Sequence, residues 1–297
     1  MQTFNFEVKP QYVYENELYV NSDKTTAVFR VKNSSMNRIE VLKSLRYTNS
    51  TEKNNIMKEI KNQILLEKYS FHIPRIYNVY EDNKNHCIWV AMEEMQGRNL
   101  REIITENEKE NGNHSHHNKY SIIDYICESL AELHSLEGFV HKDLKPENII
   151  VNRKRHCSYI LDFGISGPGI SKGIGTEAYM SPEQRNGVDK YIVSQATDIY
   201  AFGIIAMEIL TGLPLKYGKD LILNPIGNTW AREPDWDEYD LGPNKDMKRI
   251  IKKCISQNPS DRYKNAIELK AALRSDGRTS NKRNKQKPTV VQYQRSK

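Results

Sequence analysis

Residues 141–148, which read His-Lys-Asp-Leu-Lys-Pro-Glu-Asn, decide how the rest of this chain is interpreted. They offer a carboxylate, a cation and a carboxamide within six positions, and the Asp-Phe-Gly triplet at 162–164 adds a second carboxylate nineteen residues after Asp143. Phosphoryl transfer from a nucleotide needs an acidic group that orients the attacking hydroxyl, oxygen ligands for Mg²⁺, and a cation that offsets charge on the phosphoryl oxygens. The two stretches therefore indicate phosphoryl-transfer chemistry.

Residues 141–148 resemble the catalytic loop of eukaryotic-like protein kinases, and residues 162–164 resemble the metal-binding triplet of that family. The resemblance covers roughly residues 15 to 273. It implies that Asp143 is the catalytic base, that Lys145 is the cation near the transferred phosphate, and that Asn148 and Asp162 bind Mg²⁺. A lysine two positions after Asp143 is similar to the serine/threonine branch of the family, so protein substrates with Ser or Thr acceptors are expected.

The length and composition fit one large domain or two lobes. The chain has 297 residues, of which 38% are hydrophobic, enough to bury a sizeable core. Its four cysteines lie far apart without a CxxC spacing, which favours reduced thiols over a disulfide framework or a zinc cluster. No apolar run is long enough to span a bilayer, and no charged-then-apolar segment opens the chain. We therefore expect a cytoplasmic protein without a transmembrane segment.

The net charge of +6 is concentrated in residues 275–297, which contain seven Lys or Arg residues and one Asp, a net charge of +6. The remaining 274 residues are therefore neutral overall. This segment lacks apolar periodicity, and we expect it to be disordered. Weak contact with nucleic acid or with an acidic surface is one interpretation of the segment. A solubilising or autophosphorylated end that contains Thr279 and Ser280 is the interpretation we favour.

The resemblance implies an α+β, bilobal protein-kinase fold, with a small antiparallel sheet and one helix in residues 1–95, a larger, mainly helical lobe in residues 96–274, and the basic tail 275–297. In the small lobe, β-branched and aromatic residues between polar turns predict strands, and a helical period predicts one helix. The strands are expected at 11–14, 17–20, 27–31, 38–43, 76–80 and 87–92, and the helix at 51–69.

In the larger lobe, the polar, low-complexity residues 105–118 predict an exposed loop. Apolar side chains recur with a helical period at 120–136 and at 246–273, and two short strands are expected at 149–151 and 158–161. The stretch from residue 198 to 203 is similar to the start of the family's long central helix, whose Asp198 would hold the catalytic loop through backbone N–H groups. Glu183 and Arg262 occupy the positions of the family's structural ion pair.

The resemblance also implies an ATP site. Lys43 would grip the α- and β-phosphates, with Glu59 on the predicted helix as its ion-pair partner, unless Glu59 is an ordinary surface residue. Val28 and Val41 would form the apolar roof over adenine and Ile150 its floor, while backbone groups of the hinge would read the adenine edge. The remaining expected nucleotide contacts are Glu93 and Met95 in the hinge and Val20, Asn21, Ser22, Asp23 and Thr26 in the phosphate loop.

That phosphate loop departs from the family pattern, because Asn21, Asp23 and Thr26 stand where three glycines are expected. Glycine lets a backbone approach phosphates closely and adopt φ > 0, although Asn and Asp tolerate the left-handed region better than most residues. Asp23 also adds a negative charge near the phosphates. A pseudokinase scaffold with weak nucleotide binding is therefore the main alternative to an active kinase.

Residues 164–183 resemble a short activation segment. In the family, a phosphate on this segment pairs with the arginine before the catalytic aspartate. Here that residue is Lys142, which supplies a charge but not a bidentate fork, so we expect weaker or absent switching by phosphorylation. Ser166 and Ser171 are candidate phosphorylation sites, and Thr176 resembles the threonine that bonds to Asp143 and Lys145.

Together these features favour an ATP- and Mg²⁺-dependent serine/threonine protein kinase that also phosphorylates itself. A small-molecule kinase on a related fold is a third reading. The Leu-Lys-Pro-Glu context at 144–147 and the Ser-Pro-Glu at 181–183 argue against it.

Overall fold

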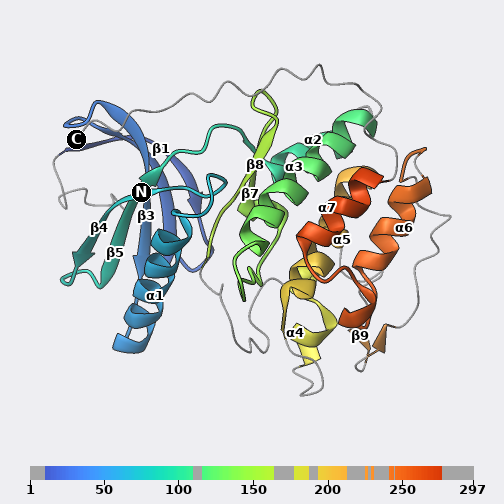
Figure 1. Cartoon of the computed structure of the whole chain (residues 1–297). Helices are drawn as coiled ribbons and strands as arrows, with labels where there is room; N and C mark the ends of the chain where they lie inside the picture. Colours follow the sequence, from blue (N-terminus) through green and yellow to red (C-terminus); the bar gives the residue numbers. More distant parts are fainter. Residues whose placement is uncertain are drawn as a thin grey trace.

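The computed structural model of the chain describes residues 11–109, 116–163, 177–186, 193–212, 225–226, 229–230, 241–243 and 245–275. Within these ranges, a small lobe built from a sheet and one helix lies beside a larger, mainly helical lobe (Figure 1). The predicted α+β, bilobal fold is therefore confirmed. The predictions for Ser166, Ser171, Thr176, residues 1–10 and most of the basic tail lie outside the described residues.

The small lobe is a five-stranded antiparallel sheet in the order β1-β2-β3-β5-β4. Side chains alternate between its two faces, so one face packs around Phe29, Leu42 and Trp89 while the other packs Ile88 and Val90 against the helix α1. The elements are β1 (Tyr12–Val20), β2 (Thr26–Asn33), β3 (Arg38–Arg46), α1 (Ser50–Leu66), β4 (Ile76–Asp82) and β5 (Cys87–Glu93).

The first strand differs from its prediction, because the two strands expected at 11–14 and 17–20 form the single strand β1. Its pairing with β2 shifts register between Tyr14 and Asn16 and again between Glu17 and Tyr19. Such bulges let a strand continue through extra residues without losing its partner. The polar residues that predicted a turn are therefore accommodated within the strand.

Helix α1 begins after Asn49, whose side chain accepts a hydrogen bond from the backbone N–H of Glu52 at 2.9 Å. This N-cap satisfies one of the N–H groups that a helix start leaves without a partner. The helix ends three residues before the predicted end at residue 69, in a turn where the N–H groups of Tyr69 and Ser70 bond to the carbonyl of Leu66. Because the cap sets the start of the helix, it also sets the position of Glu59 along it.

The larger lobe is organised around α5 (Gln195–Thr211), in which every residue from Ala196 to Leu210 is buried. A helix that is buried all round forms the centre of a domain. Around it, within the described residues, lie four helices of ten or more residues and a three-stranded sheet. These elements are α2 (Leu100–Lys109), α3 (His116–His134), α6 (Lys245–Cys254), α7 (Ala266–Ser275), β6 (Arg98–Asn99), β7 (Ile149–Asn152) and β8 (Cys157–Ile160); shorter elements are α4 (Pro182–Asn186), β9 (Pro225–Ile226) and β10 (Thr229–Trp230).

Two predictions for this lobe were wrong in part. The loop expected at 105–118 is helical at both ends, since α2 runs to Lys109 and α3 starts at His116. Glu is frequent in this segment, and both Glu and Lys are compatible with helix. The helical pattern predicted at 246–273 is two helices, α6 and α7, because a 3₁₀ turn at Pro259–Asp261 interrupts it.

Besides the chain segment that follows β5, contacts of His72 join the two lobes. The backbone N–H of Ile160 in β8 donates to the carbonyl of His72 at 2.8 Å, and the ring of His72 contacts the carboxylate of Glu132 in α3. His72 precedes β4, so these contacts connect the small lobe to the large one. Among the described residues, no helix combines the length and apolar character needed to cross a membrane.

Candidate active site

The start of the catalytic loop is held by Asp198 in the first turn of α5. The backbone N–H groups of His141 and Lys142 donate to its two carboxylate oxygens at 2.7 and 2.8 Å. His134 accepts a hydrogen bond from the N–H of Ala266 at Nδ1, so its Nε2 carries the proton and donates to Asp198 at 3.0 Å. Burial alone would raise the pKa of Asp198, but these donors hold it below its ordinary value. This is the contact that the sequence predicted.

Three predicted site residues meet within this loop. The ammonium group of Lys145 lies 3.0 Å from Oδ2 of Asp143. The side-chain amide of Asn148 donates to the carbonyl of Asp143 at 3.0 Å, and the carbonyl of Asn148 accepts from the N–H of Leu161 at 2.8 Å. That last bond places Asn148 beside the residue that precedes Asp162. The carboxylate of Asp143 therefore has both the cation of Lys145 and the amide of Asn148 next to it.

Lys43 connects the two lobes, because its ammonium group lies 3.6 Å from Glu59 on α1 and 3.4 Å from Asp162. The predicted pairing of Lys43 with Glu59 is thus present. The backbone of Asp162 has φ of +63°, in the left-handed region that non-glycine residues rarely adopt and that is often found at functional sites.

The electrostatics of this triad follow from one cation between two carboxylates. The pKa of Lys43 is raised although burial alone would lower it, because Asp162 and Glu59 flank its ammonium group. Lys43 holds the pKa of Asp162 down at about 2. Burial raises the pKa of Glu59 to about 7. Lys43 lowers this pKa only in part, and the nearby charge of Asp162 raises it further. Asp162 is therefore ionised at neutral pH.

The register of the small sheet shows where two further residues that we predicted to contact the nucleotide, Val28 and Val41, lie relative to Lys43. Val28 on β2 lies opposite Lys43, and Val41 lies opposite Met92 at the end of β5. Residues opposite one another in antiparallel strands share a face. Val28, Val41 and Lys43 therefore line the same face of the sheet, as a roof over a nucleotide requires.

Below this roof, Gly97 brings the chain that follows the hinge onto Ile150. A Cβ atom at Gly97 would lie 2.8 Å from the Cγ2 atom of Ile150 and 2.5 Å from the carbonyl oxygen of Val151, and its φ is +152°. Only glycine fits this position. In the hinge, the N–H of Glu93 donates to the carbonyl of Arg75 at 2.8 Å, and Met95 is half-buried.

The phosphate loop forms a closed turn between β1 and β2. Asn21 accepts hydrogen bonds from two later N–H groups, those of Lys24 and Thr26. The carboxylate of Asp23 accepts from the N–H and the hydroxyl of Thr25, and these bonds hold its pKa below the usual value. Val20 and Ser22 lie at the start of the same turn. Asp23 is therefore engaged within the turn.

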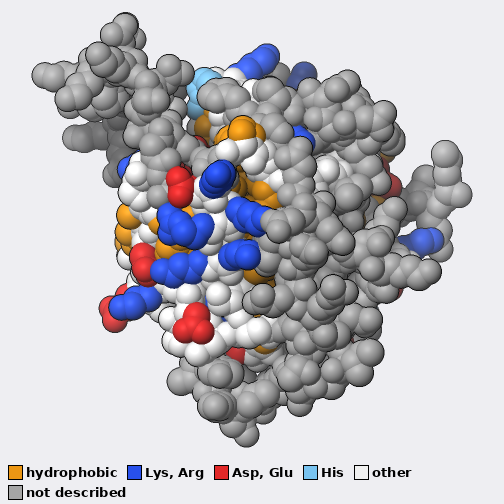
Figure 2. All heavy atoms as spheres, turned by 90° about the vertical axis from the view of Figure 1, so that its right-hand side faces the viewer, with side chains coloured by type: hydrophobic (Ala, Val, Ile, Leu, Met, Phe, Trp, Pro, Cys, Tyr) orange, Lys and Arg blue, Asp and Glu red, His pale blue; other side chains and the backbone are white. Residues whose placement is uncertain are grey.

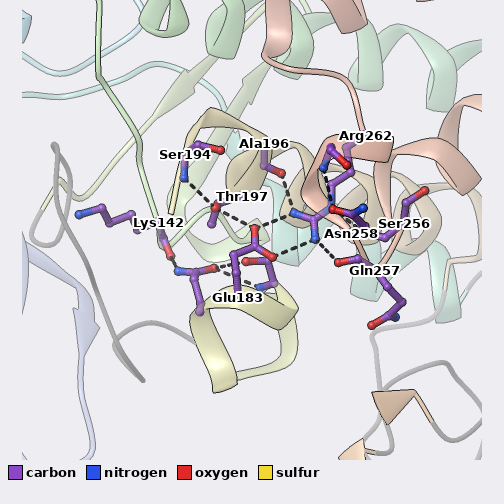
Figure 3. A network of polar contacts seen from close by, with 12 residues as sticks. Lys142, Glu183, Ser194, Ala196, Thr197, Ser256, Gln257, Asn258 and Arg262 are labelled. Carbon is purple, nitrogen blue, oxygen red and sulfur yellow. Dashed lines mark hydrogen bonds and ion pairs between the residues drawn. The ribbon is translucent and has the colours of Figure 1, made fainter. Parts of the chain in front are cut away.

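The predicted structural ion pair is present and fully buried (Figure 3). Arg262 donates to both carboxylate oxygens of Glu183, at 2.7 and 2.9 Å, and Thr197 donates to Glu183 at 2.9 Å. The neighbouring Gln184 donates to the carbonyl of Lys142 at 2.8 Å, which ties this segment to the catalytic loop. A bidentate arginine with its other donors satisfied is the arrangement in which a buried ion pair is tolerated.

Sequence reasoning missed Arg101, at the start of α2. Its guanidinium group lies 2.7 Å from Glu147 in the catalytic loop and 3.3 Å from Glu208 in α5, and it also donates to the hydroxyl of Tyr179. Tyr179 in turn donates to Glu208 at 3.0 Å. No local motif marks such a contact, because its four members come from four separate parts of the chain.

The fold, and the arrangement of Lys43, Asp143 and Asp162 in it, are those of a protein kinase. The family model described as Protein kinase domain matches residues 21–273, and the chain belongs to this family. Family members use ATP with a divalent metal, typically Mg²⁺.

The curated relatives that it matches are named serine/threonine-protein kinases. The chain is 27% identical to serine/threonine-protein kinase pkn3 of Myxococcus xanthus over 89% of its own length and 50% of that protein. It is 29% identical to a probable serine/threonine-protein kinase of Clostridium acetobutylicum, over 87% of this chain and 39% of the relative. Serine/threonine-protein kinase PknB of Mycolicibacterium smegmatis is 30% identical over 62% of this chain and 30% of the relative. The chain thus spans half or less of the length of these relatives. Their names agree with the branch inferred from Lys145.

Proposed function

We propose that this chain is an ATP- and Mg²⁺-dependent protein serine/threonine kinase that phosphorylates protein substrates and itself. The observation that carries the proposal is the position of Lys43, which lies within 3.6 Å of Glu59 in the small lobe and 3.4 Å of Asp162 in the large lobe. A cation at this junction suits the phosphates of a nucleotide that lies between the lobes. Four free cysteines support a location in the reducing cytoplasm.

In the proposed mechanism, Asp143 accepts a hydrogen bond from the substrate hydroxyl and orients it for in-line attack on the γ-phosphorus. As the new P–O bond forms, the bond between the γ-phosphorus and the β,γ-bridging oxygen breaks, ADP leaves, and Asp143 receives the proton of the hydroxyl. Lys145, 3.0 Å from Asp143, offsets the charge of the transferred phosphoryl group. The ionised carboxylate of Asp162 and the carboxamide of Asn148 are oxygen donors that fit Mg²⁺. Bound Mg²⁺ supplies charge neutralisation on the phosphate oxygens.

The test is phosphate transfer from γ-labelled ATP, to the protein itself and to a generic basic protein, by the wild type and by Asp143→Asn. The substitution keeps the size of the side chain but removes the proton acceptor, so we expect the rate to fall by about 10²- to 10⁴-fold. Equal rates would show that Asp143 is not the base. Mapping of the labelled sites by mass spectrometry would show whether Ser166, Ser171 or the tail is modified.

The closed phosphate loop is the observation that favours the alternative, a scaffold that binds nucleotide weakly. Thermal unfolding in the presence of Mg-ATP separates the two functions, because a ligand that binds only the folded state must stabilise it. Stabilisation at millimolar nucleotide supports the kinase. If the protein shows neither stabilisation nor transfer, the scaffold is the better description.

A further inference from the structure

Three consecutive backbone N–H groups in the turn between β1 and β2 donate to acceptors within the turn. The N–H of Lys24 donates to the carbonyl of Asn21 at 3.1 Å, and the next one, of Thr25, donates to Oδ1 of Asp23 at 3.1 Å. The following N–H, of Thr26, donates to Oδ1 of Asn21 at 2.9 Å. Loops that cradle phosphates do so with N–H groups that point at the ligand. Because the N–H groups of Lys24, Thr25 and Thr26 already donate to Asn21 and Asp23, they do not point at a phosphate.

A lysine occupies the tip of the same turn. Lys24 is exposed, its φ is +57°, and it makes no ion pair with any residue in the described part of the chain. The left-handed region is costly for a long side chain, and most residues found there in turns are Gly, Asn or Asp. Residues held in this region cluster at functional sites, so this one is a candidate for a function.

The strand register places the turn where the end of a nucleotide would lie. Val41 is opposite Met92 at the hinge, and Lys43, two residues further along β3, is opposite Val28. Continuing in the same direction, the carbonyl of Thr25 accepts a hydrogen bond from the N–H of Arg46 at 2.8 Å. The order along β3 is therefore hinge, Lys43 and turn. A nucleotide whose base lies at the hinge has its terminal phosphates at the turn.

We propose that Lys24 binds the terminal phosphates of the nucleotide through its ammonium group, in place of the N–H groups that the turn has used. The carboxylate of Asp23 accepts two hydrogen bonds from Thr25 but keeps its negative charge, which the neighbouring ammonium group of Lys24 offsets. A lysine acts on phosphate as a mobile point charge and does not need a fixed geometry. The inference rests on the proposed function, since it specifies how that site holds ATP.

The experiment compares Lys24→Met with the matched control Lys32→Met, which removes an exposed lysine elsewhere on β2. Affinities for Mg-ATP, Mg-ADP and AMP are measured for both variants and the wild type by thermal stabilisation or calorimetry at low salt. We expect Lys24→Met to weaken ATP binding by about 5- to 30-fold, ADP binding by less, and AMP binding not at all. Lys24→Arg should keep most of the affinity, because it keeps the charge.

Unchanged ATP affinity in Lys24→Met would overturn the inference, as would an equal loss for ATP and AMP, which would indicate a general distortion of the pocket. Raised salt should weaken ATP binding to the wild type more than to Lys24→Met, since salt screens an exposed cation. A wild type that binds no ATP would instead overturn the proposed function. The two failures are therefore distinguishable.

Discussion

At the scale of single residues, Glu59 is a partly buried carboxylate that shares its cation, Lys43, with a second carboxylate. Its carboxylate competes with Asp162 for the single cation of Lys43, at 3.6 Å against 3.4 Å. Asp162 gains most from Lys43, so its pKa falls to about 2, whereas burial raises that of Glu59 to about 7. Near neutral pH, Glu59 is therefore partly protonated while Asp162 is charged.

This difference predicts how stability depends on pH. A carboxyl whose pKa is higher in the folded than in the unfolded protein stabilises the fold below its unfolded pKa of about 4.5, and this contribution is lost as pH rises through about 7. The stability of the wild type relative to Glu59→Gln should therefore fall between pH 5 and pH 8. Urea unfolding of both proteins without nucleotide measures it.

The other titrating groups are common to both proteins and cancel in that difference. A difference in unfolding free energy that stays constant from pH 5 to pH 8 would contradict the raised pKa of Glu59. Asp162 contributes in the opposite sense, because its lowered pKa adds stability that is lost only as pH falls toward 2. It therefore does not interfere in the range that is measured.

At the scale of elements, Gly203 of α5 packs directly against the C-terminal end of α6. A Cβ atom there would lie 2.6 Å from Cγ2 of Ile255 and 2.7 Å from Cβ of Cys254. Alanine favours helix over glycine by about 1 kcal/mol, but overpacking of a core costs about 1–3 kcal/mol. We expect Gly203→Ala to lower the free energy of unfolding, as measured in urea.

The outcome for Gly203→Ala decides which effect is larger. If the variant were as stable as the wild type or more stable, the two helices would have to move apart at little cost. Gly203→Val adds two further methyl groups at the same contact and should be worse. A stable Gly203→Val variant would therefore exclude the close approach of α6.

Composition and helical period predicted most strands of the small lobe and the helices α1 and α3, because these patterns report burial. Helix α5, which is buried on all sides, was expected only from the resemblance of residues 198–203 to a helix of the family. The predictions erred where polar composition was taken for the absence of regular structure. Glu15 and Asn16 lie inside β1, and the polar residues around 105–109 lie inside α2. Polar side chains show that a segment is exposed, but an exposed segment can be strand, helix or loop.

At the scale of the whole molecule, the ion pair of Glu183 and Arg262 joins α4 to the turn before α7. Both side chains are fully buried, so removing one partner leaves an uncompensated charge inside the large lobe. Arg262→Met should therefore cost about 3–5 kcal/mol of unfolding free energy. Urea unfolding, or the soluble yield if the variant does not fold, measures the effect.

A matched variant separates the charge from the packing. Glu183→Gln combined with Arg262→Met removes both charges, and we expect it to be more stable than Arg262→Met alone. If the double variant lost as much as the single one, packing of the arginine stem rather than its charge would be responsible. The pair would then not act as a charge pair.

The sequence located Asp143, Lys145 and Asp162 because they lie in two short motifs, but it could not show contacts between distant segments. The contacts of Arg101 and the closed turn at residues 21–26 are of that kind. Net charge was equally uninformative about surfaces. The chain outside the tail is neutral, yet α6 carries five Lys or Arg residues against Asp246, a net charge of +4. Figure 2 shows Lys and Arg side chains gathered on the face where α6 lies.

The hydrogen bond between Ile160 and His72 has a mechanical consequence. It fixes the back of the small lobe to β8, while the chain after β5 fixes it at the hinge. A rigid body held along one line can only rotate about that line. We therefore expect opening of the lobes to be a rotation in which the residues around His72 move little and the β1–β2 turn moves more. Lys24, which lies in this turn, would therefore move with it when the lobes open.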